Sequence, residues 1–444
     1  MTIKTRLTIM SFLQFAVWGA YLTSMGNYLA SIGMASKIGL FYAMQGIVSI
    51  ILPAVMGIIA DRWIPVQRLF GYCHGLAAGF IIAAGYYGMI MGAEAEFSTL
   101  FFLYSCSVAF YMPTIALSNS VSYTLLTNNN YDTIKAFPPI RTLGTVGFIC
   151  AMLFVNFTGI KEGVLGFNFS NEIGFPSFQN SYAQFYVSGA LGVILFLYSF
   201  SLPHCPINKG EEKKTLSDAL GLKAFALFKD RRMAIFFIFS MFLGVSLQIT
   251  NGYANPFIAS FKEIPEFTNT WGANNANALI SLSQISETLC ILLIPYFLKR
   301  FGIKKVMLMA MVAWVLRFGL FATGDPGSGV WMFTLSMIVY GIAFDFFNVS
   351  GSLFVDQETN KNIRSSAQGV FMMMTNGFGA TIGMLGAQQV VNYFVYTHQT
   401  AEAQLTGWQT SWYIFAGYAL VVTIMFAILF KYKHNPKQEI EINH

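Results

Sequence analysis

Four ionisable side chains stand inside long apolar stretches of this 444-residue chain: Arg141, Glu287, Arg317 and Asp345. Hydrocarbon solvates charge poorly, so an ionisable group within a membrane span normally faces a cavity or a partner. Both acids belong to the second half of the chain. Burial away from water favours the protonated form of a carboxylic acid, so either acid could bind a proton in one conformation and release it in another. These residues therefore suggest reversible proton binding beside a buried site.

Uncharged hydrogen-bonding side chains accompany these charges at spacings that share one helical face. Residues three or four apart in a helix project from the same side. The pairs with this spacing are Gln248 with Asn251, Gln284 with Glu287, Arg141 with Thr145, and Tyr340 with Phe344, which precedes Asp345. Neutral donors and acceptors beside aromatic rings suit an uncharged, polyhydroxylated ligand with a flat face. A carrier of anions would need a cluster of arginines and lysines instead.

Each of these groups also has a purely structural interpretation. Amide side chains in membrane helices often join one helix to another. Arg141 stands at the predicted start of its span, where its side chain can extend to the interface. Arg317 has no polar neighbour in its own segment, and we expect it to pair with an acid for structure. Asp345 can join helices, whereas Glu287 lies about 16 Å into its helix, near mid-depth, which favours a functional role.

The composition excludes most soluble classes of protein. Hydrophobic residues make up 55% of the chain and charged residues 10%, whereas soluble domains carry about 25% charged residues. The five cysteines lack metal-ligand spacing, and four of them stand within apolar stretches. There is no Walker-type phosphate loop and no soluble segment large enough for a catalytic domain. We therefore expect an integral membrane protein that is not an enzyme, binds no cofactor or metal, and draws on an ion gradient.

Long apolar stretches recur along the chain at lengths that fit a bilayer. A helix needs about 20 apolar residues to cross about 30 Å of hydrocarbon. Continuous runs of this length predict helices, since the strands of a membrane barrel are shorter and alternate in polarity. The twelve predicted spans are residues 8–30, 38–60, 68–91, 98–126, 140–159, 183–203, 233–259, 276–298, 306–323, 330–354, 366–392 and 409–430.

The 26 Lys and Arg residues orient these spans. If both chain ends are cytoplasmic, only Lys37, Lys161 and Lys262 fall in outer loops, and nearly all the others fall in inner segments. Positive residues gather on the cytoplasmic side of membrane proteins. The distribution therefore predicts cytoplasmic termini, and it explains the net charge of +6 without a nucleic-acid partner.

The longest predicted inner loop, residues 204–232, divides the spans six and six. We expect an N-terminal bundle at 1–203, a cytoplasmic linker at 204–232, and a C-terminal bundle with a short tail at 233–444. Within the linker, TLSDALGLKAFALF combines a capping pattern with helical apolar spacing, which predicts a short amphipathic helix. Two bundles joined in this way form the layout of major facilitator transporters. The GIIADR motif at 57–62 resembles the signature loop of that superfamily.

Six longer motifs resemble a narrower group within that superfamily. They are KAFPPIRTLGTVGF, RRMAIFFIFSMFLGVSLQITN, SQISETL, GIKKVM, SMIVYGIAFDFFNVSGSLF and QGVFMMMTNGFG. Together they resemble the bacterial nucleoside:proton symporters, and the likeness extends along nearly the whole chain. The resemblance implies an all-α inner-membrane protein with twelve helices that takes up nucleosides such as uridine and adenosine with protons. Nucleosides, protons and membrane lipid are the implied partners, and we expect a monomer.

The resemblance, carried over residue by residue, implies a nucleoside site at the positions that polarity and spacing already indicate. Its substrate-binding residues would be Arg141, Thr145, Gln248, Asn251, Gln284, Glu287, Tyr340 and Phe344. The glutamate and glutamine of the eighth span would bind the ribose hydroxyls, the amides of the seventh span the edges of the base or sugar, and the phenylalanine the face of the base. Arg141, Glu287 and Asp345 would couple proton exchange to closure.

Two alternatives remain open at this point. The first keeps the transporter class but changes the solute to an oligosaccharide or another neutral polar molecule. The second is a membrane receptor built on a transporter fold, which would bind nucleoside without accumulating it. Competition by unlabelled sugars separates the first from a nucleoside carrier, and accumulation under a proton gradient separates the second.

Overall fold

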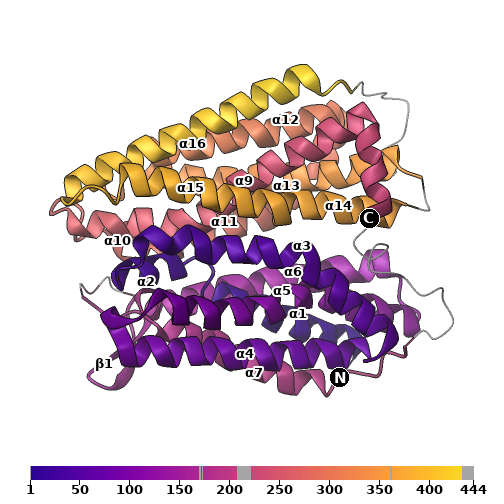
Figure 1. Cartoon of the computed structure of the whole chain (residues 1–444), viewed down its shortest axis with the longest axis horizontal. Coiled ribbons are helices and arrows are strands. Elements are labelled where there is room, and N and C mark those ends of the chain that lie inside the picture. The colour runs from indigo at the N-terminus through magenta and orange to yellow at the C-terminus, as the bar shows by residue number, and fades with distance from the viewer. Residues whose placement is uncertain (1, 170–171, 173, 208–221, 361–362, 433–444) are drawn as a thin grey trace.

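Two bundles of helices lie side by side in the computed structural model, which describes residues 2–169, 172, 174–207, 222–360 and 363–432 (Figure 1). The N-terminal bundle contains α1 (Ile3–Gly19), α2 (Met25–Ser31), α3 (Ile38–Arg62), α4 (Val66–Met91), α5 (Phe97–Asn128), α6 (Thr133–Phe157) and α7 (Ala183–Ser199). The C-terminal bundle contains α9 (Arg231–Ser260), α10 (Trp271–Asn274), α11 (Ala276–Cys290), α12 (Ile294–Thr323), α13 (Val330–Glu358), α14 (Arg364–Met372), α15 (Ala380–Phe394) and α16 (Ala401–Leu429).

The N-terminal bundle departs from the predicted spans at two places. The first span is divided into α1 and α2 by a turn at residues 20–24, where we expected one helix over 8–30. The helix of the fifth span begins at Thr133 instead of residue 140, and Pro138 and Pro139 lie inside it. The interior of a helix disfavours proline, yet α6 continues through this pair.

The C-terminal bundle folds one long helical segment back on itself. α11, the 3₁₀ turn Ile291–Leu293 and the first residues of α12 form the eighth span. At Gly302 the backbone adopts φ 75° and ψ 166°, a conformation that favours glycine, and the chain reverses. Arg317 of α12 therefore meets Ser283 of α11 at 3.3 Å, although a straight helix would separate them by about 51 Å.

The remaining spans complete the predicted count of twelve. A π-helix over Met373–Gly379 joins α14 to α15, and together they form the eleventh span. At this π-helix the backbone of α9 approaches so closely that a Cβ atom on Gly244 would lie 2.0 Å from the carbonyl oxygen of Thr375. In the described part of the chain, nine helices are long and apolar enough to cross a membrane, and the longest, residues 276–323, contains two spans. The structure confirms the prediction of an all-α membrane fold with two six-helix bundles.

Two connecting segments differ from the helical pattern. After α6 the chain forms a hairpin of β1 (Thr158–Lys161) and β2 (Val164–Phe167), with Glu162 and Gly163 both at positive φ. Two central residues with positive φ fit the tight turn that hairpins prefer. Residues 215–221 of the predicted amphipathic helix lie outside the described residues, and Leu222–Lys229 forms a 3₁₀ helix.

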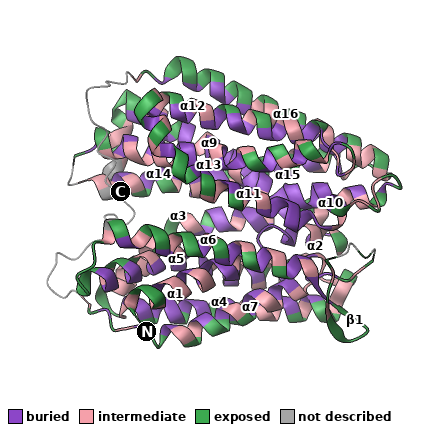
Figure 2. Cartoon of the chain, turned by 180° about the vertical axis from the view of Figure 1, so that it is seen from behind, coloured by how far each residue is buried: buried purple, intermediate pink, exposed green. Residues whose placement is uncertain are grey.

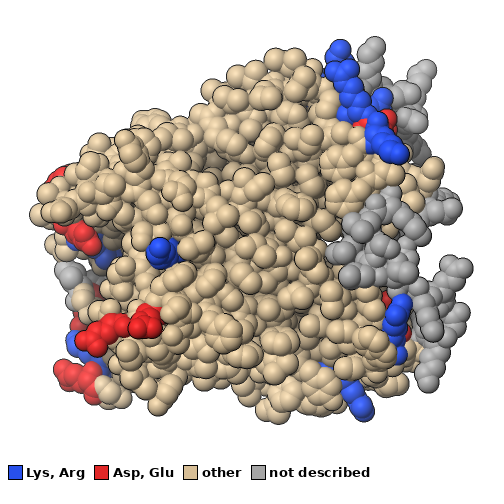
Figure 3. All heavy atoms as spheres, in the orientation of Figure 1, with Lys and Arg blue, Asp and Glu red and all other residues tan. Residues whose placement is uncertain are grey.

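The two ends of the molecule differ in structure and charge. We call the end with the β1–β2 hairpin, α2 and α10 the hairpin end. We call the opposite end, where α1 begins, α9 follows the 3₁₀ helix Leu222–Lys229 and α16 ends, the linker end (Figure 1). Figure 3 shows Lys and Arg side chains at the linker end, and most of the visible acidic side chains at the hairpin end. Buried residues concentrate where the bundles meet near α2, α10 and α11 (Figure 2).

Candidate functional site

Charged side chains from the two bundles approach one another where α6 packs against α11. Arg141 of α6 interacts electrostatically with Glu287 of α11 and with Asp345 of α13. The two carboxyl groups also interact with each other. One cation of the N-terminal bundle thus faces two acids of the C-terminal bundle.

Helix α6 places Arg141 two turns beyond its start, half-buried and in contact with α1. The helix begins at Thr133, so Arg141 lies about 12 Å along it, and the interpretation that this arginine starts its span is wrong. Its guanidinium lies over the ring of Phe15 in α1, 3.8 Å from the ring centroid. α1 can approach this closely because α6 carries Gly144 and Gly147, where a Cβ atom would overlap Phe15 and the backbone of Phe12.

The acid on α13 lacks a complete set of hydrogen-bond partners. Asp345 is 5% exposed, and its Oδ2 atom is buried without a hydrogen-bond partner among the described residues. A buried polar atom without a partner is costly. Asp345 therefore requires a proton, the nearby charge of Arg141, or a ligand to compensate it.

Amide side chains lie on the two helices beside these acids. On α9, Asn251 Nδ2 donates a hydrogen bond to Gln248 Oε1 at 3.4 Å, and Gln248 is buried. On α11, the side chain of Gln284 lies near the hydroxyl group of Tyr340. α9 packs against α11, so the amides of the seventh and eighth spans belong to one region of the C-terminal bundle.

Aromatic rings on α13 provide a flat apolar surface in the same region. The rings of Tyr340 and Phe344 are nearly parallel, with an interplanar angle of 2° and centroids 5.8 Å apart. Tyr340 interacts electrostatically with both Glu287 and Asp345. The structure therefore brings Arg141, Gln284, Glu287, Tyr340, Phe344 and Asp345 into one neighbourhood. Thr145 lies half-buried one turn beyond Arg141 on α6.

Among the described residues, Arg317 does not have the acidic partner that we expected. Its Nη1 atom donates to the carbonyl oxygen of Ser336 at 2.7 Å and to the hydroxyl of Ser283 at 3.3 Å. Its guanidinium lies 4.6 Å from the ring centroid of Tyr340. The prediction of a structural pair with an acid is wrong, because the fold brings serines and an aromatic ring of distant sequence position to this arginine.

A neutral polar network in the N-terminal bundle was missed by the sequence analysis. Gln14 Oε1 lies 2.6 Å from His74 Nε2, and Gln14 Nε2 donates to Thr114 Oγ1 at 2.8 Å. The hydroxyl group of Tyr111 donates to the carbonyl oxygen of Gln14 at 2.7 Å. Tyr111 also interacts electrostatically with Arg141. The glutamine within the apolar segment SFLQFAVWG was the signal that could have revealed this network.

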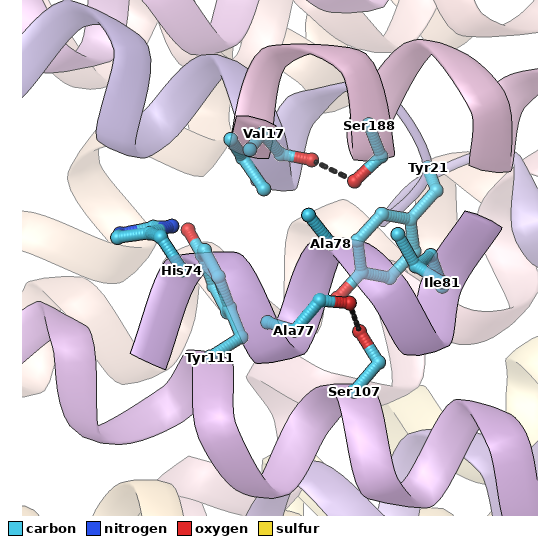
Figure 4. Close-up of a pocket in the computed structure, with 10 residues that line it drawn as sticks. Val17, Tyr21, His74, Ala77, Ala78, Ile81, Ser107, Tyr111 and Ser188 are labelled. Carbon is cyan, nitrogen blue, oxygen red and sulfur yellow. Dashed lines mark hydrogen bonds between the residues drawn. The ribbon is translucent and has the colours of Figure 1, made fainter. Parts of the chain in front are cut away.

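A small cavity borders this network inside the N-terminal bundle. Figure 4 shows His74 and Tyr111 on one side of it, and Tyr21 and Ile81 on the other. Its volume of about 10 Å³ is close to the minimum for a single water molecule. The cavity is too small for a polyhydroxylated solute, and the predicted binding residues do not line it. No group of His, Cys, Asp or Glu suited to a metal ion occurs among the residues that the structure describes.

The chain resembles characterised transporters over nearly its full length. Residues 1–435 match the family described as Nucleoside H+ symporter. Nucleoside permease NupG of Escherichia coli (strain K12) is 44% identical over 438 residues, which cover 98% of this chain and 97% of the relative. Xanthosine permease of the same organism is 43% identical, with 99% and 98% covered.

Solved structures give the same result for the fold. The crystal structure of nucleoside transporter NupG has a TM-score of 0.84 at 44% identity, covering 98% of this chain and all of that chain. A bacterial homologue of the lysosomal transporter Spinster has a TM-score of 0.66 at 14% identity, with 96% of each chain covered, and supports the fold alone. The fold and the relatives thus define a multi-pass membrane transporter of the major facilitator type, not an enzyme. Within that class, the chain belongs to the nucleoside H+ symporter family, so its activity is proton-coupled nucleoside uptake.

Proposed function

We propose that this chain imports nucleosides across a bacterial inner membrane by alternating access, with the linker end in the cytoplasm. The rocking units are residues 1–203 and 233–444, joined by 204–232. The observation that carries the proposal is the approach of Arg141 of one bundle to Glu287 and Asp345 of the other. Proton binding at such an interface changes the attraction between the bundles, which connects protonation directly to their relative movement.

The substrate site in this proposal comprises Arg141, Thr145, Gln248, Asn251, Gln284, Glu287, Tyr340 and Phe344. The amides and Glu287 offer donors and acceptors for ribose hydroxyls and base edges. The parallel rings of Tyr340 and Phe344 offer an apolar face to the flat base. Uridine, adenosine and xanthosine are the first substrates to compare, because the relatives include both a nucleoside permease and a xanthosine permease.

The proton-coupling step uses the charges at the bundle interface. With both acids ionised, Arg141 holds the two bundles together by attraction across the interface. A proton on Glu287 or Asp345 removes one negative charge and weakens this attraction. Bound nucleoside then supplies hydrogen bonds in place of the lost charge interaction, so loaded and empty carriers favour different bundle arrangements.

Hydrogen bonds at the hairpin end support the rocking model. Asn277 Nδ2 of α11 donates to the carbonyl oxygen of Met152 in α6 at 3.1 Å, and its Oδ1 accepts from Thr23. Asn156 Nδ2 of α6 donates to Asn275 Oδ1 at 2.9 Å. If the linker end is cytoplasmic, these amides close the outer side of the carrier. We call Thr23, Asn156, Asn275 and Asn277 the amide gate.

Reconstitution of the full chain in liposomes tests the proposal. Labelled uridine should accumulate above equilibrium under an inward proton gradient, and a protonophore should abolish the accumulation. Unlabelled adenosine should compete, and unlabelled sugars should not. Competition by sugars would instead favour a carrier of other neutral solutes, and binding of uridine without accumulation would favour a receptor.

A further inference from the structure

Arg317 is a fully buried cation that the proposed transport cycle does not use. It lies on α12 and is 2% exposed. Burial of a charge is expensive unless neighbouring groups compensate it. Neutral residues of similar volume can replace many buried charges without loss of stability. A charge at this position therefore requires a reason beyond packing.

The hydrogen bonds of Arg317 join three helices behind the candidate site. Its Nη1 atom reaches the carbonyl oxygen of Ser336 on α13 and the hydroxyl of Ser283 on α11. Ser336 Oγ in turn donates to the carbonyl oxygen of Arg317 at 3.0 Å. Ser283 immediately precedes Gln284, and Ser336 lies one turn before Tyr340. The guanidinium thus contacts both helices that carry the expected ribose and base contacts.

The guanidinium also lies over the ring that belongs to the candidate site. Its central carbon is 4.6 Å from the ring centroid of Tyr340 and 5.2 Å from that of Phe321. A cation over an aromatic face is attracted most strongly when both groups are desolvated. Trp314 contacts the same tyrosine edge-on, with centroids 5.9 Å apart and an angle of 89°. Arg317 and Trp314 therefore restrict the tilt of the Tyr340 ring from behind.

We propose that Arg317 is a positioning residue for nucleoside recognition: it fixes the ring and hydroxyl of Tyr340 in the orientation that binds the base and meets Gln284. The inference rests on the proposed nucleoside site. It assigns to Arg317 an effect on substrate affinity that is transmitted through Tyr340. Substitution of a purely structural arginine would change the stability or the amount of the carrier, but it would not change substrate affinity through Tyr340.

Uridine uptake by the reconstituted full chain tests the inference. Arg317→Met keeps the volume and removes the charge, and it should raise KM about tenfold while kcat changes little. Arg317→Lys keeps the charge and should raise KM about threefold. Phe426→Leu is the matched control, because Phe426 is equally buried in the C-terminal bundle and its ring contacts Phe239 and Phe430 instead. It should lower thermal stability and leave KM unchanged.

A double-mutant cycle identifies the route of the effect. In a Tyr340→Leu background, Arg317→Met should raise KM no further. An equal KM increase in both backgrounds, or an unchanged KM in the single variant, would overturn the inference. If Arg317→Met does not fold, Arg317→Lys decides by the same cycle. Accumulation of uridine by the unsubstituted chain, measured in parallel, separates this result from a failure of the proposed function.

Discussion

The interiors of the two bundles differ in the kind of polar group they contain. The N-terminal bundle contains a neutral network around Gln14, in which the glutamine side chain bonds to a histidine and a threonine. Its cation Arg141 lies at the face toward the other bundle. The C-terminal bundle contains Glu287, Asp345 and Arg317 within its helices. In the proposed mechanism, the N-terminal bundle supplies a neutral support and a single counter-charge, and the C-terminal bundle supplies the groups that exchange a proton.

Removal of the acid on α11 should have the largest effect on transport, because this acid belongs to the group of charges that only the C-terminal bundle contains. Glu287→Gln keeps hydrogen bonding but cannot exchange a proton, so uphill uptake of uridine should fall by about 100-fold or more. Accumulation in proteoliposomes under a proton gradient measures it. Glu266→Gln, at an exposed glutamate of the hairpin end, is the control and should transport normally. Full concentrative transport by Glu287→Gln would remove this acid from the mechanism.

Removal of the counter-charge should have the next largest effect. Arg141→Gln leaves both acids without their cation, and kcat for uridine uptake should fall by about 30-fold. Arg141→Lys should recover part of this loss, because the charge remains but the planar stacking on Phe15 does not. Lys135→Gln, at an exposed lysine of the same helix, should leave uptake unchanged. Equal activity of Arg141→Gln and the unsubstituted chain would show that the charge contrast between the bundles is not functional.

Weakening of the amide gate should shift the balance between conformations. Asn277→Ala removes two hydrogen bonds between the bundles, worth about 1–2 kcal/mol together, which opens the hairpin end about 5- to 30-fold more often. Spin labels at Val164 and Glu266, both exposed at that end, should report longer distances. Asn129→Ala removes a hydrogen bond within α5 and its turn and should leave the distances unchanged. Identical distance distributions in all three proteins would contradict the assignment of these amides as a gate.

The neutral network should have the smallest effect on transport. His74→Leu leaves the Oε1 atom of Gln14 without its partner, so the free energy of unfolding should fall by about 1–3 kcal/mol. The pH dependence of uridine uptake should keep its shape, because His74 belongs to the support and not to proton exchange. Thermal unfolding and uptake across a pH series measure both quantities. A shifted pH profile of uptake in His74→Leu would show that a group in the N-terminal bundle titrates during transport, and it would contradict the proposed difference between the two bundles.

Apolar length and loop charge were sufficient to predict twelve spans and two bundles, because these depend on averages over about 20 residues. Local backbone geometry could not be predicted from such averages. α6 begins at Thr133 and continues through Pro138 and Pro139, so the predicted boundary at residue 140 placed Arg141 too near the interface. The partners of Arg317 come from α11 and α13, so no pattern within its own segment could identify them. The spacing of Tyr340 and Phe344 did predict a shared face, since both belong to one helix.

The glycine contacts described above determine how each half can move. Where α1 meets α6 and where α9 meets the π-helix, main chain touches main chain with no side chain between them. Sliding one of these helices along the other would drive carbonyl oxygens into Cα atoms, whereas layers of long side chains can readjust by changing rotamers. We therefore expect the conformational change of transport to occur at interfaces lined by side chains, while each half rotates as a rigid body.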